Sequence, residues 1–465
     1  MTGFDAGNLL TLQRAAFRAQ GTPDARTRKD ALSRLEHMLL ANIDRMVAAI
    51  DADFGGRARA ETELLEFVPA LRAIRHARRH VARWMKPQRR SIDLVFQPAK
   101  AWVRLEPLGV VGIVAPWNYP LLLSVGPLCD ALAAGNRALI KPSELTPAFS
   151  TLLHELVADA FDPSEVAVIV GDVTVAEAFT ALPFDHLVFT GSTAVGRKVM
   201  RAAAENLTPV TLELGGKSPA IVAPDYSLEK AARSVAFGKF LNAGQTCIAP
   251  DYALVPNGQA QVFARLVLEA AKRGYPTVSD NDQYSAVITA RHRDRLNAAI
   301  AEVRDAGIEV LTFDEQPATS AKIAPTVVID PPSECMLMRE EIFGPVLPII
   351  SYHAIDQASG FVADRDRPLA LYLFTNDART RDRVLDTATS GGVTLNGTLL
   401  HIAQENLPFG GVGPSGMGAY HGYEGFRRLS HARSVHAVGF VNVFEKLGPP
   451  WGRVSAAISR FLARH

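Results

Sequence analysis

The sequence is poor in cysteine and has almost no excess of either charge. Its 465 residues include three cysteines, Cys129, Cys247 and Cys335, which are too few for a disulfide framework, so we expect a reducing compartment, the cytoplasm. A net charge of +1 excludes the general basicity of a protein that coats nucleic acid and the acidity of a disordered tail. The first residues also lack the basic and apolar regions of a secretory signal peptide.

Long hydrophobic runs are scarce as well, with one apparent exception. Between Glu106 and Asp130 lie 23 uncharged residues, enough in length to cross a bilayer. Four prolines and three glycines within the run would break a helix exposed to lipid. We therefore predict a buried strand, a loop and a helix in this segment.

The pattern of apolar residues changes along the chain. Residues 1–86 have helical spacing, and apolar positions at three- and four-residue steps from Leu32 to Ile50 predict one amphipathic helix that ends at Phe54. After Val110, short apolar strands alternate with helical segments, which is typical of a doubly wound parallel sheet covered on both faces. A second β/α series runs over residues 212–395, and the glycine-rich stretch 407–418 is predicted to be a loop. The sequence thus predicts an α/β fold with two α/β domains and a small additional element.

Two side chains are candidates for covalent chemistry. Cys247, in LNAGQTCIAPDY, follows a predicted helix and a polar turn that can expose the sulfur and point N–H groups at it, which favours the thiolate. A lone cysteine is more often an inert apolar residue, and Cys129 and Cys335 fit that description. Glu213, in VTLELGGKSP, is either a solvated charge or a desolvated base with a raised pKa. The two glycines that follow it permit a close backbone approach and favour the base.

Three further segments are candidates for binding. Asn118 lies in PWNYP, where an asparagine forms turns or donates to a developing oxyanion. The usual dinucleotide fingerprint is absent, but Gly191 and Ser192 precede a predicted helix whose start suits a pyrophosphate or is simply capped by Ser192. Lys141 and Glu144 follow a predicted strand, where they could hold ribose hydroxyls or form a surface ion pair.

Seven motifs in a fixed order give a specific resemblance. They are PWNYP, IKPSE, FTGSTAVG, LELGGKSP, GQTCIAPDY, EEIFGPVLP and LPFGGVGPSGMG. Over residues 28–435 the sequence resembles the NAD(P)-dependent aldehyde dehydrogenases. The short N-terminus, the Ile-Ala-Pro-Asp-Tyr after Cys247 and the ending MGAYHGYEGFRRLSHARS resemble the class 3 branch, and within it the bacterial coniferyl aldehyde dehydrogenases.

The resemblance implies a role for each candidate residue. Cys247 would be the nucleophile, Glu213 the general base and Asn118 the side-chain donor of an oxyanion hole. The cofactor, NAD with NADP usable, would be held by Lys141, Glu144, Gly191, Ser192, Glu341 and Phe343. Trp117, Tyr119 and Phe409 would line a tunnel for an aromatic or medium-chain aldehyde, and no metal is expected. Residues 1–211 would form the cofactor-binding domain, with a bridging segment near 87–105. Residues 212–395 would form the catalytic domain, and 396–465 a return segment and a tail for homodimer formation.

Other classes of function fit parts of the sequence. The basic stretch Arg72–Arg90 would suit nucleic acid, although a solvated helix face opposite Glu61, Glu63 and Glu66 explains it better and we expect no nucleic-acid partner. The amphipathic tail after Gly452 would also suit a weak contact with a membrane surface, although packing against its own subunit or a dimer mate is favoured. A coenzyme-A-acylating dehydrogenase needs no base to activate water, so Glu213 argues against that alternative.

Overall fold

The computed structural model describes residues 5–314 and 320–464. The chain begins with α1 (Ala6–Gln20), α2 (Ala25–Ala41) and α3 (Ile43–Phe54). The prediction of one helix from Leu32 to Phe54 is wrong, because the chain breaks at Asn42 (φ −129°). The Asn42 amide donates to the carbonyl of Met38 (2.9 Å), a local bond that competes with helix continuation. The apolar face nevertheless continues across the break, and both Leu32 and Ile50 are fully buried.

The helical region ends with α4 (Arg59–Thr62), a π-helical turn η1 (Glu63–Phe67) and α5 (Val68–Trp84). Two of the acidic residues named opposite the basic stretch are buried, since Glu61 and Glu66 are 8% and 0% exposed. On α5, Arg75 and Arg78 each pair with Glu36 of α2 at 2.6 Å. Part of the basic stretch is therefore neutralised within the fold.

A six-stranded sheet has the order β15-β7-β6-β3-β4-β5, and all neighbours except β15 and β7 run parallel. Its strands are β3 (Val110–Val114), β4 (Arg137–Lys141), β5 (Val166–Val168), β6 (His186–Thr190), β7 (Val210–Glu213) and β15 (Gly416–Met417). The connecting helices are α6 (Pro120–Ala134), α7 (Pro147–Ala160), α8 (Val173–Thr180) and α9 (Thr193–Ala204). The strand order reverses between β3 and β6, so the loops after these two strands open into one crevice.

The order of these strands confirms the predicted doubly wound sheet. The uncharged run after Glu106 forms the end of β2, then β3, a loop and α6, as predicted. Within the described parts of the chain, no helix combines the length and apolarity that a membrane span requires. The predicted loop at residues 407–418 is wrong at Gly416 and Met417, because these residues form β15 beside β7.

A seven-stranded sheet with the order β10-β11-β12-β9-β8-β13-β14 forms the second α/β unit, and only β10 is antiparallel to its neighbour. Its strands are β8 (Pro219–Val222), β9 (Tyr252–Pro256), β10 (Val310–Thr312), β11 (Thr326–Ile329), β12 (Val346–Tyr352), β13 (Ala370–Phe374) and β14 (Gly392–Leu395). Its helices are α10 (Leu228–Phe240), the 3₁₀ turn η3 (Leu241–Gly244), α11 (Ala260–Gly274), α12 (Ala290–Asp305), α13 (Met336–Arg339), α14 (Ile355–Ala363) and α15 (Ala378–Thr387).

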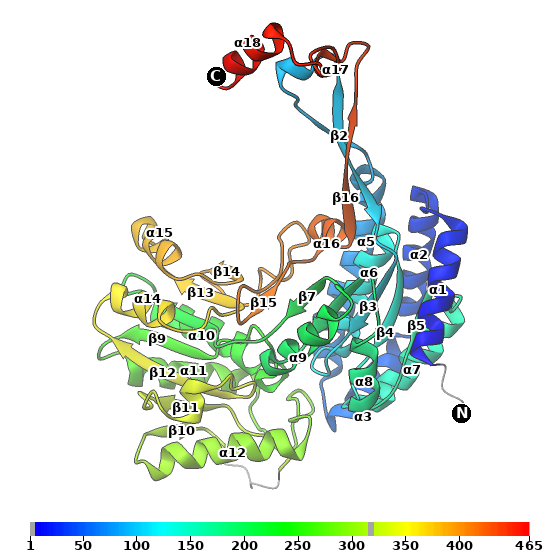
Figure 1. The fold of residues 1–465 in the computed structure, drawn as a ribbon. Coiled ribbons are helices and arrows are strands. Elements are labelled where there is room, and N and C mark those ends of the chain that lie inside the picture. The colour runs from blue at the N-terminus through cyan, green and yellow to red at the C-terminus, as the bar shows by residue number, and fades with distance from the viewer. Residues whose placement is uncertain (1–4, 315–319, 465) are drawn as a thin grey trace.

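A long arm projects from the body of the molecule (Figure 1). It contains β1 (Gln88–Arg90), η2 (Leu94–Phe96), β2 (Lys100–Pro107) and β16 (Ser430–Ala437), which make an antiparallel sheet in the order β1-β2-β16. Helix α16 (Gly422–Arg428) leads into β16, and α17 (Val443–Lys446) and α18 (Arg453–Leu462) lie at the far end of the arm. We call residues 88–107 and 430–464 the arm.

Candidate active site

Cys247 is presented by a tight turn at the end of α10. Asn242, Ala243 and Gly244 have φ values of 51°, 49° and 74°, a left-handed run that is costly for the two non-glycine residues. Cys247 follows this turn and lines a cavity of about 260 Å³. The other two cysteines, Cys129 and Cys335, are buried in apolar clusters, as the sequence predicted.

The surroundings of Cys247 disfavour its thiolate. Burial, together with the nearby carboxyls of Glu341 and Glu213, raises its pKa to about 12. The N–H groups of Cys247 and Ile248 interact with the sulfur and lower the pKa, as expected from the sequence, but they do not outweigh the burial. Activation of this thiol for attack stays a prediction, and burial is the effect that opposes it.

Glu213 ends β7 and lines the same cavity as Cys247. Its carbonyl accepts a hydrogen bond from Gly191 N–H (3.0 Å), and its backbone pairs with Gly416 of β15. Both carboxyl oxygens are buried, and neither has a hydrogen-bond partner among the residues that the structure describes. Burial raises the pKa of Glu213 well above the usual carboxyl range, and the positive charge of Arg428 offsets this only in part. A desolvated carboxyl of this kind is suited to take a proton from water.

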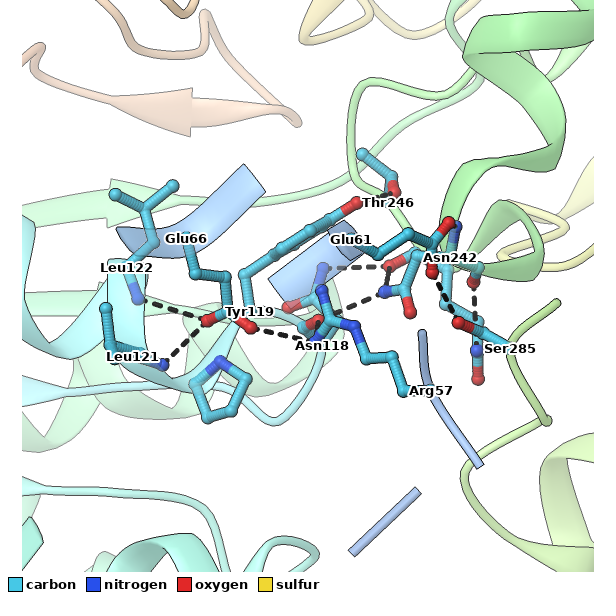
Figure 2. Close-up of polar contacts among 12 residues, drawn as sticks. Arg57, Glu61, Glu66, Asn118, Tyr119, Leu121, Leu122, Asn242, Thr246 and Ser285 are labelled. Carbon is cyan, nitrogen blue, oxygen red and sulfur yellow. Dashed lines mark hydrogen bonds and ion pairs between the residues drawn. The ribbon is translucent and has the colours of Figure 1, made fainter. Parts of the chain in front are cut away.

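Asn118 lies in the loop after β3, beside the turn that presents Cys247 (Figure 2). Its side-chain amide donates to the carbonyl of Gln245 (3.1 Å). Its main-chain oxygen accepts from Asn242 Nδ2 (3.0 Å) and from Arg57 Nη1 (3.3 Å). The Asn118 amide has two hydrogens, so it can donate a second bond, although Asn118 is not among the residues that line the cavity of Cys247.

The cavity is mostly apolar, and Tyr119 and Phe409 line it. Trp117, which the sequence placed with them, lies outside this lining. Its ring packs against His292 and Phe343 at centroid distances of 5.3 and 5.4 Å. Four ionisable side chains that the sequence did not assign to the pocket also line the cavity: Arg72, Asp130, Glu405 and His421. Their positions in the sequence, spread over 350 residues, gave no signal of this proximity.

The predicted cofactor residues lie at the expected strand ends. Lys141 ends β4, is 1% exposed, and lies 3.8 Å from the carboxylate of Glu144. Ser192 is the N-cap of α9, where its hydroxyl accepts from Val195 N–H (3.4 Å). Both interpretations of Ser192 are thus compatible, because an N-cap at a helix start also leaves N–H groups for a phosphate.

Comparison with known proteins defines the family. The model of the aldehyde dehydrogenase family matches residues 5–435. The chain is 49% identical over 445 residues to a probable coniferyl aldehyde dehydrogenase of Pseudomonas aeruginosa, covering 96% of this chain and 93% of that protein. It is 38% identical over 421 residues to mouse aldehyde dehydrogenase family 3 member A2, covering 90% and 86%. A solved substrate-bound AldH of Staphylococcus aureus is 35% identical, with a TM-score of 0.93 over 98% of this chain and all of that one.

The chain belongs to the aldehyde dehydrogenase family. The predicted resemblance to class 3 members and to bacterial coniferyl aldehyde dehydrogenases is confirmed. The prediction of a nicotinamide dinucleotide cofactor is also confirmed at the level of the family, whose solved members include an NAD-bound enzyme.

Close contacts and a strained backbone define the conformation of Glu341 and Phe343, the residues that the resemblance assigns to the nicotinamide end of the cofactor. The Glu341 carboxyl is buried, which raises its pKa to about 8, and the N–H of Gly216 donates to it. A side chain at Gly215 would collide with this carboxyl, which explains the glycine. Phe343 has a φ of 49°, a strained backbone that directs its ring toward Trp117.

A buried ionic cluster that the sequence reasoning missed anchors the Glu341–Phe343 loop. Lys217 pairs with Asp251 and also donates to the carbonyls of Leu337 (2.7 Å) and Glu340 (2.9 Å). The second carboxylate oxygen of Asp251 accepts from Ile342 N–H (3.0 Å). Lys217 lies in LELGGKSP and Asp251 in GQTCIAPDY, two of the motifs that carried the resemblance. Their place in these motifs was the sequence feature that could have indicated a role at the site.

Proposed function

We propose that this enzyme oxidises an aldehyde to the carboxylic acid through a thiohemiacetal and then a thioester on Cys247. The observation that supports this most directly is that the Cys247 thiol and the unpartnered Glu213 carboxyl line one apolar cavity. A nucleophile and a separate base in the same enclosed space are what acyl transfer to water requires.

Each residue then has a defined task. The thiol of Cys247 gives up its proton to water as its sulfur attacks the carbonyl carbon. The resulting oxyanion accepts hydrogen bonds from the Asn118 amide and the Cys247 N–H. In comparable sites one such donor contributes roughly 10²–10³ in rate. A nicotinamide cofactor, held by Glu341 and Phe343 among others, would supply the hydride acceptor needed to convert the thiohemiacetal to the thioester on Cys247. Glu213 removes a proton from water, which attacks the thioester, releases the acid and regenerates the thiol.

The cofactor proposed for this chain is NAD, with NADP usable. The carboxylate of Glu144, which is 37% exposed, is free to accept a hydrogen bond from the ribose 2′-hydroxyl. A 2′-phosphate at the same place would meet its negative charge, which the neighbouring Lys141 offsets in part. These opposing charges support a preference for NAD rather than its exclusive use.

The proposed substrate is an aromatic aldehyde of the coniferyl type or a medium-chain aldehyde. The apolar cavity of about 260 Å³ supports this choice, as does the similarity to a probable coniferyl aldehyde dehydrogenase. Tyr119 and Phe409 provide aromatic surface within it, and rings pack favourably against such surface.

The proposed setting is the cytoplasm, with the enzyme a homodimer. The low cysteine content supports a reducing compartment. At the far end of the arm, Phe440 and Trp451 are 92% and 75% exposed, which supports burial of the arm against a second subunit. Weak contact of α18 with a membrane surface is the alternative use of this apolar surface, and vesicle flotation distinguishes the two.

The function is tested first by Cys247→Ala. We expect oxidation of coniferyl aldehyde to fall below a few per cent of the wild-type rate, while NAD binding changes less than about twofold, because other residues hold the cofactor. Steady-state NADH formation and a cofactor titration measure the two effects. Cys335→Ala is the matched control and should retain activity. Substantial oxidation by Cys247→Ala would remove this thiol from the mechanism.

Glu213→Gln separates the two halves of the reaction. The amide keeps the shape of the side chain but cannot take a proton from water, so thioester hydrolysis should slow more than hydride transfer. Rapid mixing should show a burst of about one NADH per active site, followed by slow turnover. Equal slowing of both phases would assign Glu213 to another step.

A further inference from the structure

The two proposed oxyanion donors lie on loops of different sheets. Asn118 follows β3 of the six-stranded sheet, and Cys247 precedes β9 of the seven-stranded sheet. Stabilisation of an oxyanion depends on the distance between its two donors. The loops of Asn118 and Cys247 must therefore be held at a fixed distance from each other. A third segment, between α3 and α5, contacts both loops (Figure 2).

The first contact of this segment is a fully buried ion pair. Arg57 Nη1 lies 2.8 Å from Glu66 Oε1, and both side chains are 0% exposed. The other oxygen of Glu66 accepts from the N–H groups of Leu121 (2.8 Å) and Leu122 (3.2 Å), at the start of α6. Glu66 therefore holds the helix that begins two residues after Asn118.

Arg57 also reaches Asn118 directly, because the same Nη1 donates to the Asn118 carbonyl (3.3 Å). Its guanidinium lies 4.9 Å from the ring of Phe54 and 5.0 Å from the ring of Tyr119. Its Nε and Nη2 atoms are buried without a hydrogen-bond partner. Two buried N–H donors without partners lower the stability of the fold. The contribution of Arg57 therefore lies in the bonds of its Nη1 atom to Glu66 and Asn118.

The second contact fixes the turn before Cys247. Glu61 Oε1 accepts from the N–H of Asn242 (2.8 Å), and its other oxygen accepts from the hydroxyl of Ser285 (2.5 Å). Asn242 is the first left-handed residue of that turn, and its side chain donates to the carbonyl of Asn118. The carbonyl of Asn118 thus receives one bond from each loop-holding group, Arg57 and Asn242.

We propose that Arg57, Glu61 and Glu66 are positioning residues that set the distance between the Asn118 amide and the Cys247 N–H in the oxyanion hole. The inference rests on the function proposed above and deepens it. None of the three side chains lines the cavity of Cys247. Their polar contacts are instead with Asn118, with Asn242 and with the start of α6.

A double-mutant cycle between Arg57→Lys and Asn118→Ala tests this coupling. Lysine keeps the positive charge beside Glu66 but not the planar group that spans Glu66 and Asn118. The readout is the rate of the first NADH burst after rapid mixing of the NAD-loaded enzyme with coniferyl aldehyde. Arg28→Lys is the matched control, because Arg28 is 2% exposed and donates to the carbonyl of Ala133 far from Asn118.

We expect Arg57→Lys to slow the burst about tenfold, since small misplacements of reacting groups carry large costs. Arg28→Lys should change it less than about twofold, at a similar loss of thermal stability. In the Asn118→Ala background, Arg57→Lys should change the remaining rate less than about twofold, because the donor it positions is gone. A full tenfold loss in that background, or an equal loss in Arg28→Lys, would overturn the proposal.

Two further results separate this proposal from the proposed function. A wild-type burst rate in Asn118→Ala would overturn both the oxyanion assignment and the positioning role, whereas additive losses would overturn the positioning role alone. If Arg57→Lys does not fold, Ser285→Ala replaces it in the cycle, since it removes only the hydroxyl that orients Glu61. We expect a slowing of about threefold that disappears in the Asn118→Ala background, and its persistence there would overturn the proposal.

Discussion

At the scale of single residues, the active site contains carboxyls whose charge is suppressed. Glu213 and Glu341 are both buried within the electrostatic range of Cys247, and each raises the pKa of that thiol. Their own pKa values are raised by burial. Raised pKa values favour the protonated forms of these two carboxyls, so the activity and the stability of the enzyme should depend on pH.

The raised pKa of Glu341 predicts a loss of stability with rising pH. The folded chain holds this proton up to about pH 8, while the unfolded chain releases it near the ordinary value of 4.5. The contribution of Glu341 is therefore fully present below pH 4.5 and is lost as the pH rises to about 8. Glu341→Gln removes this dependence. The melting temperature of the variant minus that of wild type should therefore increase by more than about 2 °C from pH 6 to pH 9.

Thermal unfolding of both proteins across this range measures the gain. Glu340→Gln is the control, since the Glu340 side chain is 64% exposed and its variant should follow wild type at every pH. Parallel curves for wild type and Glu341→Gln would show that Glu341 is already ionised at neutral pH.

At the scale of elements, the short strand β15 fixes the base. Leu214 N–H donates to the carbonyl of Ser415 (3.0 Å), and Gly416 pairs with Glu213, so β15 covers the free edge of β7 at the active site. Gly416 has a φ of +152° and packs so closely that a side chain would meet the carbonyl of Leu212. Only glycine allows this approach.

Gly416→Ala should therefore displace β15 and with it Glu213. We expect kcat to fall by about tenfold or more, because misplacing the base slows thioester hydrolysis. Gly413→Ala is the matched control in the same loop. Its φ of +64° brings similar backbone strain, but a side chain there would meet no atom within 4 Å. Steady-state rates and melting temperatures of both variants test this, and equal losses in the two would contradict the steric argument.

At the scale of the whole molecule, the arm is formed by distant segments. Residues 430–437 pair with residues 100–107 along the full length of both strands, so two segments more than 300 residues apart in sequence are joined outside the α/β body. The sheet has only three strands, and Val438 and Phe440, just beyond β16, are 59% and 92% exposed. A slender element with large exposed apolar groups gains stability by packing on another surface.

We expect the full chain to sediment as a dimer and Phe440→Asp to dissociate it at concentrations where wild type stays dimeric. A charge buried in an interface without a partner opposes association. Leu207→Asp is the matched control, because Leu207 is equally exposed at 89% but lies on the loop before β7. Analytical ultracentrifugation measures all three proteins. A monomeric wild type at micromolar concentration would contradict the prediction.

The sequence by itself determined the elements and the chemistry that depends on local order. Apolar runs predicted most strands of both sheets. The order of the motifs predicted the family, because a nucleophile, a glycine-lined strand end and a helix start each depend on a few consecutive residues. The wrong predictions were also local. The side chain of Asn42 bonds to the Met38 carbonyl where one long helix was predicted, and two residues of a predicted loop form β15.

Only the tertiary structure decided which distant residues share an environment. The sequence alone gave no role to Glu61 and Glu66, yet the fold buries them against Asn242 and α6, more than 50 residues away. The same holds for the suppressed acidity of Cys247, since the desolvation that raises its pKa comes from packing and not from its neighbours in sequence. Burial and Coulomb interactions depend on distance in space, and a one-dimensional pattern does not contain that distance.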